Sequence, residues 1–201
     1  MPPTDEQLVA AYLDHGDQDA FRVLVERHQE RVFGYLMGMV RDRDLANDLF
    51  QETFLRVVSA MQKRRGSYTQ QGRWLGWVLR IARNATLDHL RSRKKWLDVD
   101  ADDEEGASFW DRLPDDAPAA DETLHHGEVS DRLEACIADL PPEQREVLLL
   151  RHETDLTFRE IAELTDVSIN TALGRMRYAL LNLRKMLDTP RTSQPARSQA
   201  L

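Results

Sequence analysis

The sequence predicts an all-α protein made of two small helical domains joined by a flexible acidic linker. Apolar residues recur at steps of three and four along most of the chain, and no stretch alternates apolar and polar residues as a strand would. One segment, residues 98–122, is acidic, contains prolines and lacks an apolar period, as a linker does. We therefore expect a first domain at 1–97, a linker at 98–127, a second domain at 128–188 and a disordered tail at 189–201.

The first domain is expected to contain four helices. A short amphipathic helix around residues 8–13 ends at Gly16, and a polar loop at 62–72 precedes the last helix. The three longer helices are expected at 20–40, 45–61 and 73–93.

The second domain begins with a helix that ends near Leu140, and Pro142 marks the start of the next helix, at 143–152. A helix-turn-helix pattern follows at 157–187. Thr157 and Glu160 have the spacing of a capping box, and Ser168 is suited to be the N-cap of the last helix.

The last helix has two different sides. A predicted buried stripe repeats at steps of four and three: Ile169, Leu173, Met176, Leu180, Leu183 and Leu187. At about 100° per residue the opposite side is polar, small or cationic. It carries Thr171, Gly174, Arg175, Tyr178, Asn182 and Lys185, with Asn170, Arg177 and Arg184 flanking it. Such a surface suits the major groove of duplex DNA.

Composition and charge limit the function. With 41% hydrophobic and 31% charged residues, no membrane-spanning window and no signal-peptide pattern, the chain is expected to be cytoplasmic, without membrane insertion. The lone Cys136 excludes an internal disulfide and a cysteine-based zinc site, so we expect no metal and no cofactor. The net charge of −8 is concentrated in residues 98–134, where 14 acids face 2 basic residues, whereas residues 1–97 carry 16 basic and 12 acidic residues. Either end can therefore bind nucleic acid.

A second nucleic-acid surface is predicted at residues 60–97, which hold 10 basic residues and a single acid. Tyr68, Trp74, Trp77 and Trp96 are interspersed with these cations. Cations that contact phosphates beside rings on which bases stack are typical of single-strand binding. Core packing explains Trp74 and Trp77 equally well.

These segments carry family motifs. Residues 44–56 (DLANDLFQETFLR), residues 77–84 (WVLRIARN) with Asp88 and Arg91, and residues 140–151 (LPPEQREVLLLR) resemble, in order, segments of bacterial sigma-70 factors. Because only the second and fourth sigma domains are recognisable, the resemblance is to the extracytoplasmic-function (ECF) group. It implies a non-enzymatic subunit that directs RNA polymerase to promoters.

The resemblance also implies partners and site residues. The β′ clamp helices of core polymerase would contact Asp48, Leu49, Gln51, Glu52 and Leu55. The β flap and an anti-sigma factor are further implied partners. The −10 element would be opened and read, with a flipped base trapped, by Lys63, Arg64, Arg65, Tyr68, Arg73, Trp74, Trp77, Arg80, Arg83 and Asn84.

Duplex −35 DNA would be contacted by Ser168, Asn170, Thr171, Gly174, Arg175, Arg177 and Tyr178. Leu173 stands where many family members have a cation, and its place on the predicted buried stripe suggests packing. The loop at 62–73 is longer than is usual in the family, and neither its role nor that of Phe109 and Trp110 in the linker follows from the sequence.

Two other classes of function remain as alternatives. A helix-turn-helix regulator that acts without polymerase would bind duplex DNA alone, and the basic, aromatic segment at 60–97 argues against it. A metalloenzyme would need His125 and His126 beside Glu122 and Glu128 as ligands. Adjacent histidines cannot both face one metal from a regular helix, which argues against this class.

Overall fold

The computed structural model describes residues 2–63, 74–97 and 126–188. Within these ranges the chain forms α-helices and no strand, which confirms the all-α prediction. The helices are α1 (Asp5–His15), α2 (Gln18–Val40), α3 (Arg43–Lys63), α4 (Trp74–Leu97), α5 (His126–Ala138), α6 (Pro142–Thr154), α7 (Phe158–Thr165) and α8 (Ile169–Asp188). None of these described helices is both long and apolar enough to cross a membrane.

The helix boundaries follow from local capping chemistry. Thr4 caps α1 through a capping box with Gln7, and Gly16 ends that helix in the left-handed conformation at φ 68°. Asp17 then caps α2 by accepting hydrogen bonds from the first free backbone N–H groups. The predicted break at Gly16 is thus confirmed, and it turns the chain so that α1 packs on α2.

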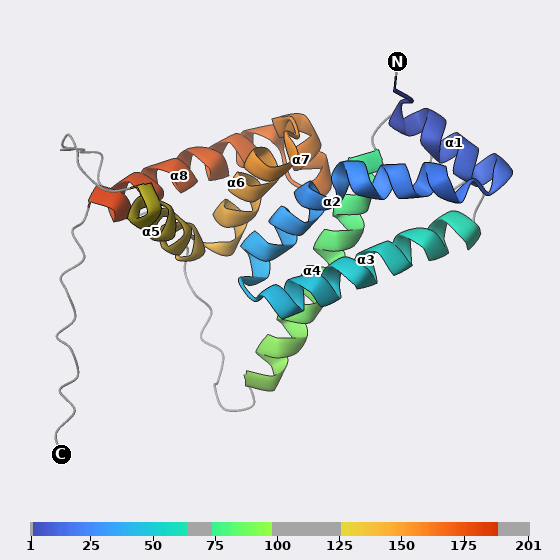
Figure 1. Cartoon of the computed structure of the whole chain (residues 1–201). Coiled ribbons are helices and arrows are strands. Elements are labelled where there is room, and N and C mark those ends of the chain that lie inside the picture. The colour runs from blue at the N-terminus through green and yellow to red at the C-terminus, as the bar shows by residue number, and fades with distance from the viewer. Residues whose placement is uncertain (1, 64–73, 98–125, 189–201) are drawn as a thin grey trace.

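The helices form two groups, α1 to α4 and α5 to α8, and these groups pack directly against each other (Figure 1). Helix α2 contacts α6 extensively, and α4 contacts α7. One continuous cluster of buried apolar side chains joins the groups and includes Tyr35 and Leu36 of α2 with Val147, Leu149 and Leu150 of α6. The packing of one group on the other was not anticipated from the sequence.

The domain boundaries inferred from the sequence remain a proposal. Helix α5 begins at His126, inside the range expected to be linker. Residues 98–125, with Phe109 and Trp110, and the tail at 189–201 lie outside the described part of the chain.

Candidate nucleic-acid interface

Helix α4 presents part of the predicted single-strand surface. Residues 77, 80 and 84 follow helical spacing, so Trp77, Arg80 and Asn84 lie along one stripe, with Arg83 beside it. Arg80 and Asn84 are exposed, whereas Trp77 and Arg83 are partly buried. An exposed amide beside cations can donate to and accept from a base edge while the cations contact phosphates.

Trp74 does not belong to this surface as the structure places it. Its side chain is 1% exposed and packs against His28 at 5.3 Å and Phe54 at 6.4 Å between ring centroids. The helix turns the first residue of α4 inward, so its ring is part of the core and cannot stack on a base. Core packing, the alternative explanation for Trp74, is therefore correct.

The rest of the predicted −10 set cannot be located. Arg64, Arg65, Tyr68 and Arg73 lie outside the described residues, and Lys63 ends α3 with a side chain that is not described either. Their role stays a prediction.

Two cations of α4 contact the second group of helices. Arg83 donates from Nε to Glu146 Oε1 at 2.8 Å and from Nη2 to Glu146 Oε2 at 3.3 Å. Arg80 Nη2 donates to the backbone carbonyl of Glu163 at 3.1 Å. Arg80 and Arg83 were both predicted to contact DNA, and in the structure both make hydrogen bonds within the protein.

Glu146 lies in a buried polar centre. It is 4% exposed, and the hydroxyl of the fully buried Tyr35 donates to its Oε1 at 3.2 Å. Burial, followed by the nearby Glu146 carboxylate, raises the pKa of Tyr35 well above its usual value, so the phenol stays protonated and remains a donor. Sequence reasoning missed this centre because Glu146 is an ordinary glutamate in an amphipathic helix.

The helix-turn-helix forms as predicted. Thr157 and Glu160 make both hydrogen bonds of the capping box at the start of α7. Asp166 ends α7 in the left-handed conformation at φ 59°. The Ser168 Oγ accepts from the Thr171 backbone N–H at 3.0 Å, which confirms Ser168 as the cap of α8. This turn leaves the N-terminus of α8 exposed, where a phosphate is favoured.

The predicted buried stripe of α8 is only partly correct, because Leu183 is buried and Met176 and Leu187 are partly buried, whereas Ile169, Leu173 and Leu180 are exposed. The buried residues of this helix are Ala172, Ala179 and Leu183. Leu173 is 44% exposed and Leu180 is 52% exposed, so both lie on the outer surface. The two alanines allow α8 to approach its neighbours closely, which rotates the larger leucines outward.

The predicted −35 residues all lie on the outer part of α8 or at its cap. Ser168, Asn170, Thr171, Arg177 and Tyr178 are exposed, and Gly174 and Arg175 are partly exposed. A Cβ at Gly174 would meet nothing within 4 Å, so an approaching backbone has room there. This half of the molecule presents its predicted reading side chains to solvent.

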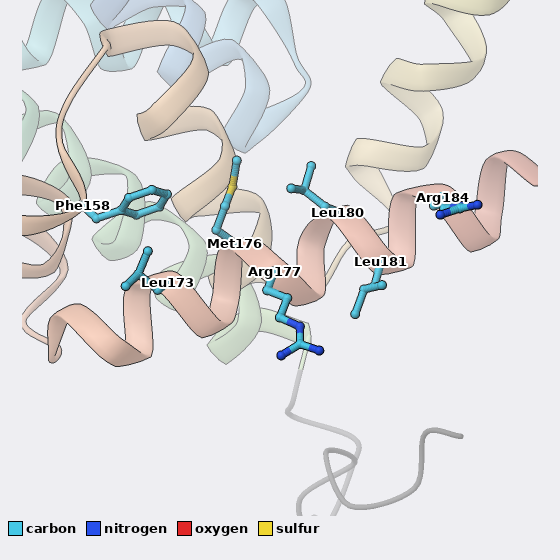
Figure 2. Close-up of a pocket in the computed structure, with 7 residues that line it drawn as sticks. All are labelled: Phe158, Leu173, Met176, Arg177, Leu180, Leu181 and Arg184. Carbon is cyan, nitrogen blue, oxygen red and sulfur yellow. The ribbon is translucent and has the colours of Figure 1, made fainter. Parts of the chain in front are cut away.

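An apolar groove runs along the other edge of α8 (Figure 2). It has a volume of about 450 Å³, and Phe158 of α7 lies beside Leu173 at one end. The remaining lining residues are Met176, Arg177, Leu180, Leu181 and Arg184. Exposed leucines are not suited to phosphates, so this groove fits a protein partner better than DNA.

The predicted polymerase-contacting face on α3 is mostly open. Asp48 and Gln51 are exposed, Glu52 is half-buried and pairs with Arg56 at 2.5 Å, and Leu55 is 69% exposed. Leu49 is only 3% exposed and packs in the core, so it supports this face from below and does not form part of it.

No group of three or more His, Cys, Asp or Glu side chains suited to a metal occurs among the described residues. The histidine pair considered as a metal site lies outside them, apart from the backbone of His126. Cys136 is a buried free thiol.

Comparison with known families and proteins agrees with this geometry. Residues 24–95 match the model of sigma-70 region 2, and residues 130–183 match that of sigma-70 region 4. The chain is 36% identical over 172 residues to the RNA polymerase sigma factor CarQ of Myxococcus xanthus, covering 86% of this chain and 91% of the relative. It is 27% identical over 174 residues to the ECF sigma factor SigW of Bacillus subtilis, covering 86% and 91% of the two chains.

Two solved structures share the fold. CnrH in complex with the cytosolic domain of CnrY aligns with a TM-score of 0.62 at 20% identity, over 92% of this chain and 97% of that one. The sigma factor RpoE in complex with the anti-sigma factor NepR from Bartonella quintana aligns with a TM-score of 0.60 at 19% identity, over 85% and 98%.

Proposed function

The chain belongs to the ECF group of sigma-70 factors, and on that premise we propose how its two halves divide promoter recognition. As a sigma factor it binds core RNA polymerase and promoter DNA and directs initiation. We propose that α4, with the loop before it, reads and opens the −10 element, and that α8 reads the −35 element in the major groove.

The main support for this division is that the α4 surface and the α8 surface differ in chemistry. On α4 an exposed amide, Asn84, lies beside cations and the partly buried ring of Trp77, which suits splayed bases. On α8 the capped N-terminus is followed by the open position Gly174 and by Arg175, Arg177 and Tyr178, which suits the edges and phosphates of a duplex.

Core polymerase is proposed to contact the face of α3 formed by Asp48, Gln51, Glu52 and Leu55. An exposed leucine with polar side chains around it has the apolar centre and polar rim of a protein interface. The β′ clamp helices are the proposed partner there, and the β flap that of the α8 half. Catalysis belongs to the polymerase, so no catalytic step is assigned to this chain, and the cytoplasm is its proposed location.

An anti-sigma factor is a further proposed partner. One solved neighbour, RpoE of Bartonella quintana, is described as a complex with an anti-sigma factor, and the apolar groove on α8 offers an exposed surface of suitable chemistry.

Transcription in vitro with core polymerase over a randomised promoter library tests the proposal. Selected templates should contain two motifs at a fixed spacing. Asn84→Ala should relax selection in the downstream motif only, and Arg175→Ala in the upstream motif only. A core enzyme that initiates no better with this protein than without it contradicts the function, and both variants relaxing the same motif contradicts the division of labour.

A further inference from the structure

The contact between the two groups of helices is built for close approach. Gly34 and Gly38 of α2, four residues apart, face α6. A Cβ on Gly38 would lie 2.5 Å from Leu149 Cδ2, and one on Gly34 would lie 2.5 Å from Glu153 Oε2. Leu149 is buried, whereas Glu153 can move its carboxylate, so Gly38 is the position where a side chain would hold the helices apart.

A charged pair lies inside this contact. The Glu146 carboxylate receives two hydrogen bonds from Arg83, and its side chain is 5% exposed against 19% for that of Arg83. The arrangement of two parallel N–H donors on one carboxylate is the one that guanidinium also makes with a phosphate. While Glu146 holds Nε and Nη2, that edge of Arg83 is not available to a nucleic acid.

A second cation of α4 is held in a similar way. The Glu163 carbonyl that accepts from Arg80 lies in the last turn of α7, where carbonyls carry no helical partner and attract cations. Arg80 and Arg83 are both members of the proposed −10 surface. The C-terminal helices therefore supply hydrogen-bond acceptors at both positions, a carboxylate for Arg83 and a backbone carbonyl for Arg80, where DNA would offer phosphate oxygens.

We propose that Glu146 acts as an internal phosphate mimic that holds the chain closed, and that single-stranded promoter DNA competes with it for Arg83. Release of the pair separates α6 and α7 from α2 and α4 and frees Arg80 and Arg83 for DNA. The proposal rests on the function proposed for α4, and it adds that the free chain masks these two arginines. A buried pair is suited to such a switch, since its attraction is offset by the cost of desolvating both charges.

The variants that test it are Glu146→Gln, which removes the charge at nearly constant shape, and Gly38→Ala, which forces α2 and α6 apart. Alanine favours the helix more than glycine, so Gly38→Ala does not weaken α2 itself. The matched control for the first is Glu143→Gln, the same change at an exposed position of α6. Gly174→Ala, where the new Cβ meets nothing within 4 Å, controls the second in the distance measurement.

Two readouts are needed on the full chain. Spin labels at Ser59→Cys on α3 and Glu134→Cys on α5, in a Cys136→Ser background, report the distance between the helix groups. Fluorescence anisotropy reports binding of a short mixed-sequence single-stranded oligonucleotide. We expect Glu146→Gln and Gly38→Ala to bind it about tenfold more tightly than wild type and to populate a longer label distance. Wild type should shift to that distance as oligonucleotide is added. Glu143→Gln should match wild type in both measurements, and Gly174→Ala should keep the wild-type label distance.

If Glu146→Gln and Gly38→Ala both keep the wild-type label distance and the wild-type affinity for the oligonucleotide, the proposal is wrong. If circular dichroism shows that Glu146→Gln has lost its helices, Gly38→Ala decides alone. The function itself is judged separately by transcription with core polymerase. A chain that opens as expected but never stimulates initiation refutes the function and leaves the masking intact.

Discussion

The two surfaces proposed for DNA differ in what their cations contact. On α4, Arg83 is paired with Glu146 and Arg80 with a backbone carbonyl of α7, so the surface is part of the tertiary packing. On α8, Arg177 is exposed, and the buried side chains of this helix are those of Ala172, Ala179 and Leu183. Substitutions of Arg80 or Arg83 therefore affect fold and function together, whereas substitutions at exposed positions of α8 can affect binding alone.

The largest expected effect is on the free energy of unfolding, and it distinguishes the buried Trp74 of α4 from the partly exposed Trp77. Truncating the buried ring in Trp74→Ala should lower the free energy of unfolding by about 3–5 kcal/mol, because it leaves a cavity. Trp77→Ala should cost clearly less, since that ring is partly exposed. Urea denaturation measures both, and equal losses would show that the two rings are equivalent in the core.

Asn84→Ala tests whether the exposed amide of α4 reads a base. Loss of paired hydrogen bonds to one base should reduce promoter opening by an amount equivalent to about 1–3 kcal/mol. Permanganate reactivity of unpaired thymines in the complex with core polymerase measures opening. Stability should be unchanged because the side chain is exposed, and a fall in melting temperature would instead indicate a structural role.

Arg177→Ala tests the α8 surface, where function should separate from fold. Loss of one phosphate contact should weaken binding to −35 duplex DNA at all sequences and reduce the slope of log affinity against log salt by about 1. Titrations of the polymerase complex at several salt concentrations measure it. A changed base preference with an unchanged slope would show that Arg177 reads a base edge.

Thr157→Ala removes the capping box that starts the helix-turn-helix. We expect a loss of about 1 kcal/mol in the free energy of unfolding, because the Thr157 hydroxyl no longer accepts from the Glu160 backbone N–H or donates to its carboxylate, while the Thr157 backbone N–H still donates to Glu160. Chemical denaturation measures the loss. A Thr157→Ser variant keeps the hydroxyl and should restore most of it, and failure of serine to do so would point to packing of the threonine methyl group.

The smallest effect is a pH dependence confined to the N-terminal half. Burial lowers the pKa of His28 from its ordinary 6.5, and the opposing attraction of Asp5, 2.7 Å from Nε2, only partly offsets this. The unfolded chain then binds more protons, so stability is full above about 6.5 and falls as the pH drops below it. His28→Gln should flatten this part of the profile, whereas His152→Gln, at an exposed position, should leave it unchanged.

Much of the local structure could be predicted from the sequence. Apolar spacing of three and four located each described helix, and capping pairs such as Thr157 with Glu160 fixed where helices begin. These signals are legible because they depend on interactions within a few residues. The motifs in α3, α4 and α6 also sufficed to indicate the family.

Tertiary structure decided which side of each helix is buried. Leu173 had the spacing of a core residue and is exposed, whereas Trp74 and Leu49 appeared in proposed contact sets and are buried. Spacing defines a helix but not its rotation, which depends on where small residues such as Ala172 and Gly38 let a neighbour approach. The pairing of Arg83 with Glu146, 63 residues apart, likewise exists only because α4 and α6 meet in space.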